Sequence, residues 1–238
     1  MLDERLRTAV RLYDRCALAA DIGTDHAFLP SALLREGICD RMILTDLSES
    51  ALANARKEIQ RRGLTGRVEL RCGDGLAPLR EKCDMISILG MGGRTVADIL
   101  LEGRDRLRGA SLLLSSHTDL DRVRRAVMEI GYRLTAETPC LDAGRYYLLM
   151  KAVPGAETLS ALQLRTGARL ESSDSPVLLP WMAHRLEVLE AKRRGLERAE
   201  TPDEAELARV REDAAYYTNF IKNAALRAPG TADPLKER

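Results

Sequence analysis

Four short segments, each placed directly after an apolar run, carry the residues of this chain that could do chemistry. Their sequences are Asp21-Ile22-Gly23-Thr24-Asp25-His26, Asp46-Leu47, Gly73-Asp74-Gly75 and Gly90-Met91-Gly92-Gly93. Carboxylates accept hydrogen bonds from hydroxyl and amino groups, and glycine lets the backbone pass close to a ligand. In an open parallel sheet a ligand lies beyond the carboxyl ends of the strands. The four segments together therefore predict one small-molecule site along that edge.

The first segment makes a glycine turn at Gly23 but lacks the dinucleotide fingerprint. Asp25 stands where the second glycine of Gly-x-Gly would let the backbone approach a pyrophosphate. An acidic loop repels a diphosphate, whereas it tolerates the sulfonium and amino groups of S-adenosylmethionine. We therefore expect Asp21, Gly23 and Thr24 to bind S-adenosylmethionine rather than a nicotinamide nucleotide.

The other three segments fit the remaining parts of the same cofactor. Asp46 follows the glycine turn by about twenty residues, where a carboxylate can accept both ribose hydroxyls, and Leu47 lies next to it. The carboxylate of Gly73-Asp74-Gly75 can accept a hydrogen bond from the adenine amino group. Gly90-Met91-Gly92 leaves little side-chain bulk where the methyl group should face its acceptor. Each glycine turn taken alone also fits an ordinary tight turn.

The candidate catalytic residues are Asp25, His26 and His117. Asp25 and His26 belong to the glycine turn after the first apolar run, and His117 follows the fifth apolar run. His26 fits equally well as a polar residue at the start of a helix, and His117 is open to the same two interpretations.

Apolar runs and helical patterns alternate up to about residue 153, which is typical of a parallel sheet built from strand-helix-strand units. The predicted strands cover residues 17–22, 42–45, 68–72, 85–89, 110–115, 132–138 and 145–153. Only a short turn around Asp142-Ala143-Gly144 separates the last two, so they must be antiparallel. This pattern predicts an α/β fold with the seven-stranded, Rossmann-like sheet of class I methyltransferases, rather than the six-stranded dinucleotide fold.

A domain boundary is predicted at Pro154-Gly155. Residues 1–154 form the expected S-adenosylmethionine-dependent methyltransferase domain, and residues 155–238 form the expected linker and helical hairpin. Apolar residues of the second part step by three and four along two helices: Met182, Leu186, Leu189 and Leu196, then Leu207, Val210, Ala214, Tyr217 and Ile221. Thr201-Pro202-Asp203-Glu204 has the residues of a capping box. We therefore expect a C-terminal α-helical coiled-coil hairpin.

Composition limits the partners and the compartment. The five cysteines are scattered without a Cys-x-x-Cys pair, so we expect reduced thiols and no structural metal. No apolar run suits a membrane span or a signal peptide, which predicts a cytoplasmic protein without membrane contact. The formal charge of +1 gives no overall attraction to a polyanion, so local arginine clusters would have to hold a nucleic acid. A monomer or a weak homodimer is expected.

The segment Asp21-Ile22-Gly23-Thr24-Asp25-His26-Ala27-Phe28-Leu29-Pro30 resembles the signature of the TrmK family, the bacterial tRNA adenine-22 N1-methyltransferases. The resemblance continues through Gly73-Asp74-Gly75-Leu76, Gly90-Met91-Gly92-Gly93 and the helical hairpin. It implies methyl transfer from S-adenosylmethionine to N1 of adenine 22 in the D-arm of tRNA, with the hairpin assisting tRNA docking. This chain has Ser115-Ser116-His117-Thr118 where the family often has Gln-Pro after the fifth strand.

Two other functions are compatible with these residues. A methyltransferase of the same fold acting on a small molecule, or on another RNA position, would keep the same cofactor site. A noncatalytic RNA-binding protein would keep the fold without turnover. Asp46 and Asp74 favour an enzyme, because a protein that does not bind the cofactor has no use for these carboxylates.

Overall fold

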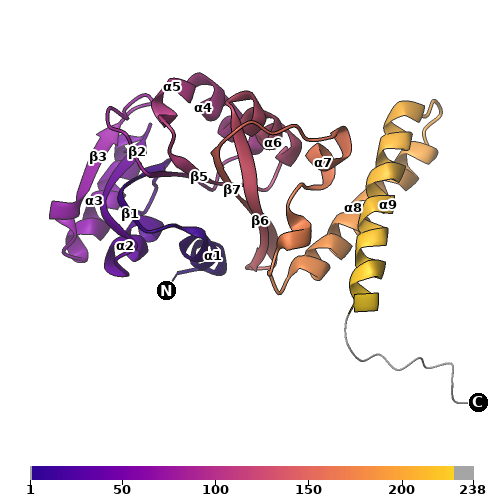
Figure 1. The fold of residues 1–238 in the computed structure, drawn as a ribbon, viewed down its shortest axis with the longest axis horizontal. Coiled ribbons are helices and arrows are strands. Elements are labelled where there is room, and N and C mark those ends of the chain that lie inside the picture. Colours follow the sequence, from indigo (N-terminus) through magenta and orange to yellow (C-terminus); the bar gives the residue numbers. More distant parts are fainter. Residues whose placement is uncertain (1, 228–238) are drawn as a thin grey trace, which may run out of the picture. The chain divides into compact units, whose positions relative to one another are not determined.

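The computed structural model describes residues 2–227. The chain divides into two compact units, the first ending at Ser175 and the second beginning at Pro176. The first unit contains one seven-stranded sheet with helices packed on it, and the second contains two long helices (Figure 1). The α/β class and the Rossmann-like sheet predicted from the sequence are confirmed.

The seven strands follow the order β3-β2-β1-β4-β5-β7-β6 across the sheet. Their bounds are Cys16–Ile22 (β1), Cys39–Asp46 (β2), Val68–Cys72 (β3), Met85–Ile88 (β4), Ser111–Ser116 (β5), Tyr132–Asp142 (β6) and Arg145–Pro154 (β7). Strands β1 to β5 pair in parallel, whereas β7 runs antiparallel to both β5 and β6. Each predicted strand is present, and the predicted closing hairpin is confirmed.

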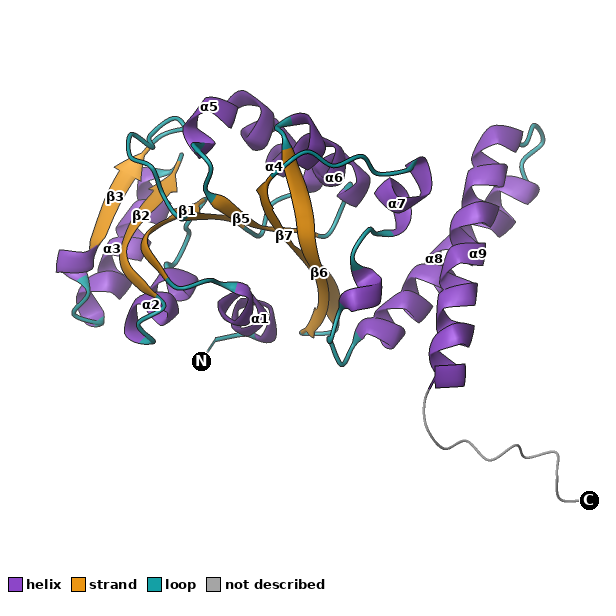
Figure 2. Ribbon diagram, viewed as in Figure 1, coloured by secondary structure: helices purple, strands orange, loops and turns teal. Residues whose placement is uncertain are grey.

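Helices cover both faces of this sheet (Figure 2). Their bounds are Glu4–Leu12 (α1), Phe28–Arg35 (α2), Glu49–Arg61 (α3), Gly93–Glu102 (α4), Arg104–Leu107 (α5), Leu120–Glu129 (α6) and Ala161–Thr166 (α7), with short 3-10 turns at Thr65–Arg67 and Leu170–Ser172. Ser48 caps α3 by accepting a hydrogen bond from the Ala51 amide, as its position predicted. The crossover helices place successive parallel strands so that their carboxyl ends share one edge.

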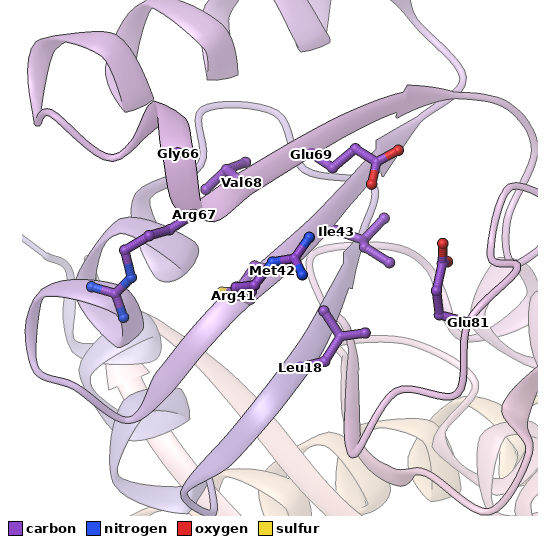
Figure 3. A pocket seen from close by; sticks show the side chains of 9 residues that line it. All are labelled: Leu18, Arg41, Met42, Ile43, Gly66, Arg67, Val68, Glu69 and Glu81. Atoms are coloured by element: carbon purple, nitrogen blue, oxygen red, sulfur yellow. The ribbon is translucent and has the colours of Figure 1, made fainter.

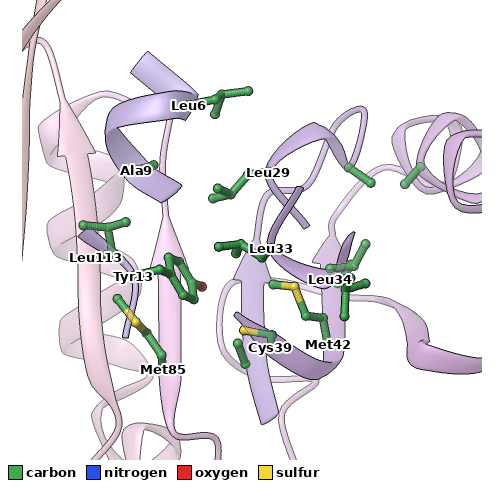
Figure 4. Close-up of a cluster of buried hydrophobic side chains, with 14 of the residues drawn as sticks. Leu6, Ala9, Tyr13, Leu29, Leu33, Leu34, Cys39, Met42, Met85 and Leu113 are labelled. Atoms are coloured by element: carbon green, nitrogen blue, oxygen red, sulfur yellow. The ribbon is translucent and has the colours of Figure 1, made fainter. Parts of the chain in front are cut away.

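A large apolar cluster holds α1 and α2 against the sheet (Figure 4). Leu6 and Ala9 of α1 pack in the same cluster as Leu33 of α2 and Met42 of β2. Full burial of one such aliphatic side chain stabilises the fold by about 2 kcal/mol. This packing fixes α1, and with it Arg5, which precedes Leu6 in the chain.

The segment after β7 belongs to the first unit. This unit therefore extends past the boundary predicted at Pro154-Gly155. The buried Glu137 carboxylate accepts hydrogen bonds from the buried Arg124 guanidinium and from the Ala168 and Arg169 amides. Arg124 also donates to the Leu164 carbonyl at 2.7 Å. A buried ion pair that uses backbone groups of residues 164–169 ties this segment to β6 and α6.

The second unit is a pair of helices, α8 (Leu178–Glu197) and α9 (Glu204–Arg227), that pack against each other. The Trp181 ring meets the Tyr217 ring edge to face with centroids 6.1 Å apart, and both side chains are buried. The helix start predicted at Thr201 is wrong by two residues. Asp203 caps α9, because its carboxylate accepts the Glu206 amide hydrogen bond at 2.9 Å.

Within residues 2–227 no helix combines the length and the apolar character that crossing a bilayer demands. In the same part of the chain, no three His, Cys, Asp or Glu side chains are grouped so that they could hold a metal ion. All five cysteines are free thiols.

Candidate active site

The four predicted segments lie together at the carboxyl ends of β1, β2, β3 and β4. Ile22 of β1 is paired with Thr45 of β2 and with Ile88 of β4, so these strands end side by side. Backbone hydrogen bonds then join the loops: the Gly23 and Thr24 amides donate to the Thr45 carbonyl at 2.8 and 3.0 Å. The Gly73 amide donates to the Asp46 carbonyl at 3.0 Å. The four segments therefore follow one edge of the sheet.

The first and fourth segments touch each other at Gly23. This glycine has φ +75°, and a β-carbon there would collide with the end of the Met91 side chain. Gly90 also has a left-handed φ of +81°, and a β-carbon there would lie 3.2 Å from Arg5 Nη1. Both positions need glycine because the backbone turns steeply and a neighbouring side chain approaches closely.

Asp21 is a buried carboxylate at the end of β1, with 7% of its surface exposed. Its Oδ1 accepts a hydrogen bond from the Ser87 hydroxyl at 2.6 Å, and Ser87 Oγ in turn accepts one from the Tyr13 hydroxyl at 3.1 Å. Burial raises the pKa of Asp21 to about 6, against the lowering effect of the Ser87 hydrogen bond and the Arg5 charge. A cationic group placed beside Asp21 would favour its charged form.

A cavity of about 330 Å³ opens at this point. Its lining includes six of the predicted site residues, Asp21, Gly23, Thr24, Asp25, His26 and Gly90, together with Arg5, Leu6 and Phe28. A second cavity, of about 340 Å³, is lined by Asp74, Gly75, Ile99 and Arg106 among others. A third hollow, of about 110 Å³, lies at the opposite ends of β1, β2 and β3 and contains none of the predicted residues (Figure 3).

Two aromatic rings lie at the first cavity. The His26 ring stacks on Phe28 with centroids 5.4 Å apart and an angle of 23° between the planes. His26 Nε2 lies 3.2 Å from Asp25 Oδ2, and Phe28 is 46% exposed. Exposed, stacked rings provide a flat face on which another planar ring can stack. The sequence identified Asp25 and His26 here but missed Phe28.

Asp46, Leu47, Gly73 and Asp74 lie further along the edge, at β2 and β3. One Asp46 carboxylate oxygen accepts the Ser48 amide hydrogen bond at 2.8 Å, which orients this half-buried side chain. Leu47 is 71% exposed, and Asp74 is exposed in a turn closed by the Ala77 amide. Two carboxylates thus follow neighbouring strands outside the first cavity.

His117 does not line the cavity that contains Asp25 and His26. It is exposed directly after β5, and its ring meets Tyr147 edge to face at 6.5 Å. The Arg5 guanidinium also lies over the Tyr147 ring, 5.3 Å from its centroid. The structure therefore links His117 to the cavity through Tyr147 and Arg5, rather than directly.

Gly92 and Gly93 bring the fourth segment against the turn after β5. The Gly93 amide donates to Thr118 Oγ1 at 3.3 Å, and Gly92 precedes the first residue of α4. A β-carbon on Gly93 would lie 2.7 Å from the Asp119 carbonyl oxygen and closer still to that of Thr118. The loops after β4 and β5 thus fit together backbone to backbone.

Sequence reasoning missed the helix that completes the site. The sequence assigned no site role to Arg5, yet Arg5 lines the first cavity beside Asp21 and Gly90. Tyr147 and Ser87 were also missed. The one available signal was the amphipathic pattern of residues 4–12, which predicts that this helix packs on the sheet.

Several basic side chains of α1 and α8 are paired with acids. Glu4 binds both Arg7 and Arg11, at 2.9 and 2.8 Å. On α8, Arg193 binds Glu190 and Glu197. Exposed ion pairs contribute little to stability, but they reduce the net positive charge offered to a phosphate.

The chain matches the family model described as "Methyltransferase domain" over residues 2–150. A curated relative, the tRNA (adenine(22)-N(1))-methyltransferase of Bacillus subtilis strain 168, is 30% identical over 156 residues. That alignment covers 65% of this chain and 66% of the relative, just under two thirds of its length.

Solved structures agree over almost the whole chain. Streptococcus pneumoniae Sp1610 in complex with S-adenosyl-L-methionine is 28% identical, with a TM-score of 0.81, covering 93% of this chain and 100% of that one. The B. subtilis M1A22 tRNA methyltransferase TrmK is 24% identical with a TM-score of 0.80, covering 93% and 99%, and supports the fold alone. The chain therefore belongs to the methyltransferase-domain family, and its relatives and structural neighbours include tRNA adenine-22 N1-methyltransferases.

Proposed function

We propose that this protein transfers a methyl group from S-adenosylmethionine to N1 of adenine 22 in the D-arm of tRNA. The observation that carries the proposal is the buried Asp21 carboxylate beside the bare backbone of Gly23, at the edge where four strands end. The names of the B. subtilis relative and of the S. pneumoniae complex support the choice of acceptor and cofactor.

The residues present fit S-adenosylmethionine. We propose that Asp21, Gly23 and Thr24 hold its cationic end, because the lining of the first cavity there contains carboxylates and a glycine without a side chain. Asp46 would accept from the ribose and Asp74 from the adenine, with Leu47, Gly73 and Gly75 around them. Gly90, Met91 and Gly92 would face the methyl group, and Arg5 offers positive charge to a carboxylate or phosphate. When bound, S-adenosylmethionine supplies an electrophilic methyl group.

The remaining catalytic work is positioning. Adenine N1 carries its own lone pair, so the protein need not remove a proton before attack, and it must align N1 and exclude water. We assign the orientation of the base to Asp25 and His26, with Phe28 as a stacking surface, and a more distant role to His117. Because N1 is paired or stacked in folded tRNA, the base would have to be extruded into the cavity.

Methylation of unmodified tRNA with labelled S-adenosylmethionine, followed by mapping of the modified nucleotide, tests the proposal. Label at N1 of adenine 22 is the expected result. Label at another nucleotide would overturn the proposed specificity, and turnover only on small molecules would remove tRNA as the substrate. Weakening of tRNA binding as the salt concentration rises is also expected, because phosphate contacts release counterions.

Asp46→Ala is expected to weaken S-adenosylmethionine binding by about 10- to 100-fold, the usual effect of losing hydrogen bonds to a charged acceptor. Titration calorimetry measures this change directly. Asp40→Ala is the matched control, because Asp40 is exposed at the opposite end of the same strand. Equal affinities of Asp46→Ala and the native protein would remove Asp46 from the site.

Asp21→Asn is expected to stabilise the folded protein at neutral pH while weakening cofactor binding. Folding raises the pKa of Asp21 from 3.8 to about 6, so the folded state binds this proton more tightly. The contribution of Asp21 to stability is complete below about pH 4 and is lost as the pH rises through 6. The amide cannot ionise, so the variant gains up to about 3 kcal/mol at pH 8.

Denaturant unfolding of the Asp21→Asn variant at pH 4 and pH 8 checks this expectation. The gain in free energy of unfolding should be present at pH 8 and absent at pH 4. A gain of the same size at both pH values would show that ionisation of Asp21 is not its cause. Asp40→Asn, an exposed substitution on β2, is the control for the same measurement.

Removal of the second unit after Ser175 is expected to reduce tRNA methylation by at least about tenfold and to leave S-adenosylmethionine binding nearly unchanged. The reason is that the proposed cofactor residues all belong to the first unit, whereas phosphate contacts add affinity for tRNA alone. Steady-state kinetics on tRNA and calorimetry on the cofactor separate the two. Equal losses would mean that the helices of the second unit only support folding.

A further inference from the structure

Two cysteines face each other at the amino-terminal ends of β1 and β2. Cys16 and Cys39 are direct register partners in this parallel pair, and their sulfur atoms lie 2.8 Å apart. Neighbouring strands are about 4.8 Å apart. That spacing falls within the Cα separations of roughly 4.4 to 6.8 Å that a disulfide bond spans. The backbone separation is therefore one that a disulfide bond can span, and the sulfur atoms are already in contact.

The two thiols differ in access and in acidity. Cys39 is completely buried in the apolar cluster under α2 (Figure 4), whereas Cys16 is only partly buried. The hydrogen bond between the two thiols lowers the pKa of the Cys16 thiol, against the opposing effects of burial and of the charge on Asp84. The same contact raises the pKa of Cys39. Cys16 is thus the more accessible and the more acidic of the two thiols, and Cys39 is its internal partner.

The backbone around both residues is held in place. The Cys16 amide donates to the Ile38 carbonyl at 2.9 Å, directly before β2. Arg67 donates to the Cys39 carbonyl at 2.6 Å and to the Leu34 carbonyl at 2.8 Å. These hydrogen bonds keep the two cysteines in register.

We propose that Cys16 and Cys39 form a reversible disulfide, with a small-molecule disulfide such as oxidised glutathione as the oxidant. The Cys16 thiolate attacks one sulfur of the oxidant and releases one thiolate. Cys39 then loses its proton and attacks the Cys16 sulfur of the mixed disulfide, which releases the second thiolate. The protein loses two electrons and two protons, and the oxidant becomes two thiols.

The bond would close the β1-α2-β2 unit, which contains the turn at Gly23. It would lie at the start of the two strands, whereas Gly23 follows the end of β1 and Asp46 is the last residue of β2. The cross-link restricts the unfolded chain and so stabilises the folded one. We therefore expect oxidation to raise the thermal stability and to leave S-adenosylmethionine binding unchanged.

The test is incubation of the full-length protein with oxidised glutathione, followed by mass spectrometry of the intact chain and of its non-reduced digest. The expected result is a peptide that links Cys16 to Cys39 and a rise in Tm of about 5–10 °C that dithiothreitol reverses. A mixed disulfide that persists on Cys16 of the native protein would overturn the proposal, and so would a linked peptide that joins other cysteines.

Two variants make the assignment specific. Cys72→Ser removes a solvent-exposed thiol outside the pair and should leave the response intact. Cys39→Ser should trap glutathione on Cys16 and abolish the rise in Tm, because no resolving thiol remains. A rise in Tm of Cys39→Ser on oxidation would contradict the proposed pair. Cofactor affinity, measured on the same samples, reports on the active site separately.

Discussion

Replacement of Glu137 by alanine is expected to lower the free energy of unfolding by about 3–5 kcal/mol, the usual cost of breaking a buried ion pair. Glu137 and Arg124 are both 0% exposed, with Arg124 Nε 2.7 Å from Glu137 Oε1. The second carboxylate oxygen accepts the Arg169 amide at 2.7 Å and the Ala168 amide. Loss of the carboxylate would leave a buried guanidinium charge and two amides without their partner.

Urea unfolding measures this effect as a lower transition midpoint. Glu69→Ala provides the matched control, because it also removes a carboxylate that binds an arginine, Arg71, but on the surface. The control should lose no more than about 1 kcal/mol. A Glu137→Ala variant as stable as the control would show that residues 164–169 do not depend on this ion pair.

Gly93→Ala is expected to lower kcat/KM for tRNA methylation by about 100-fold. The new methyl group would lie 2.7 Å from the Asp119 carbonyl oxygen and closer to that of Thr118. Both contacts are backbone atoms, so a rotamer change cannot relieve them and one loop must move. Displacements of about 1 Å near reacting groups can cost about 100-fold in rate. Overpacking should also cost about 1–3 kcal/mol of stability.

Gly66→Ala is the control for Gly93→Ala. Gly66 has no atom within 4 Å of its would-be β-carbon, and its φ lies outside the left-handed region. Its substitution should therefore change neither rate nor stability appreciably. Steady-state kinetics at saturating S-adenosylmethionine compares the two variants. Native activity of Gly93→Ala would mean that the loops after β4 and β5 can separate without harm to catalysis.

The sequence predicted the sheet well because buried parallel strands appear as continuous apolar runs, a signal that depends on local residues alone. It also predicted which loops meet, because parallel strands share one carboxyl edge. Asp21, Asp25 and His26 do line one cavity. The separation of His117 from them depends on β7, whose Tyr147 comes between, and no local pattern of residues encodes that placement.

Arg124 shows why other features escaped prediction. In the sequence it stands between Val123 and Arg125 and resembles a solvated helix residue, yet it is completely buried. Its burial depends on Glu137 and on the Leu164 carbonyl, both distant in sequence. Tertiary partners of this kind decide burial, and they also decide that the first unit continues past Pro154 to Ser175.

Helix α1 and Asp14, which follows it in the chain, contact the last two strands, β6 and β7. The Glu4 amide donates to Asp142 at 3.0 Å, Arg5 lies over Tyr147, and Lys151 binds Asp14 at 2.6 Å. These partners lie on β6 and β7, more than a hundred residues further along the chain. Because Arg5 also lines the first cavity, a change in the closing hairpin can reach that cavity through this helix.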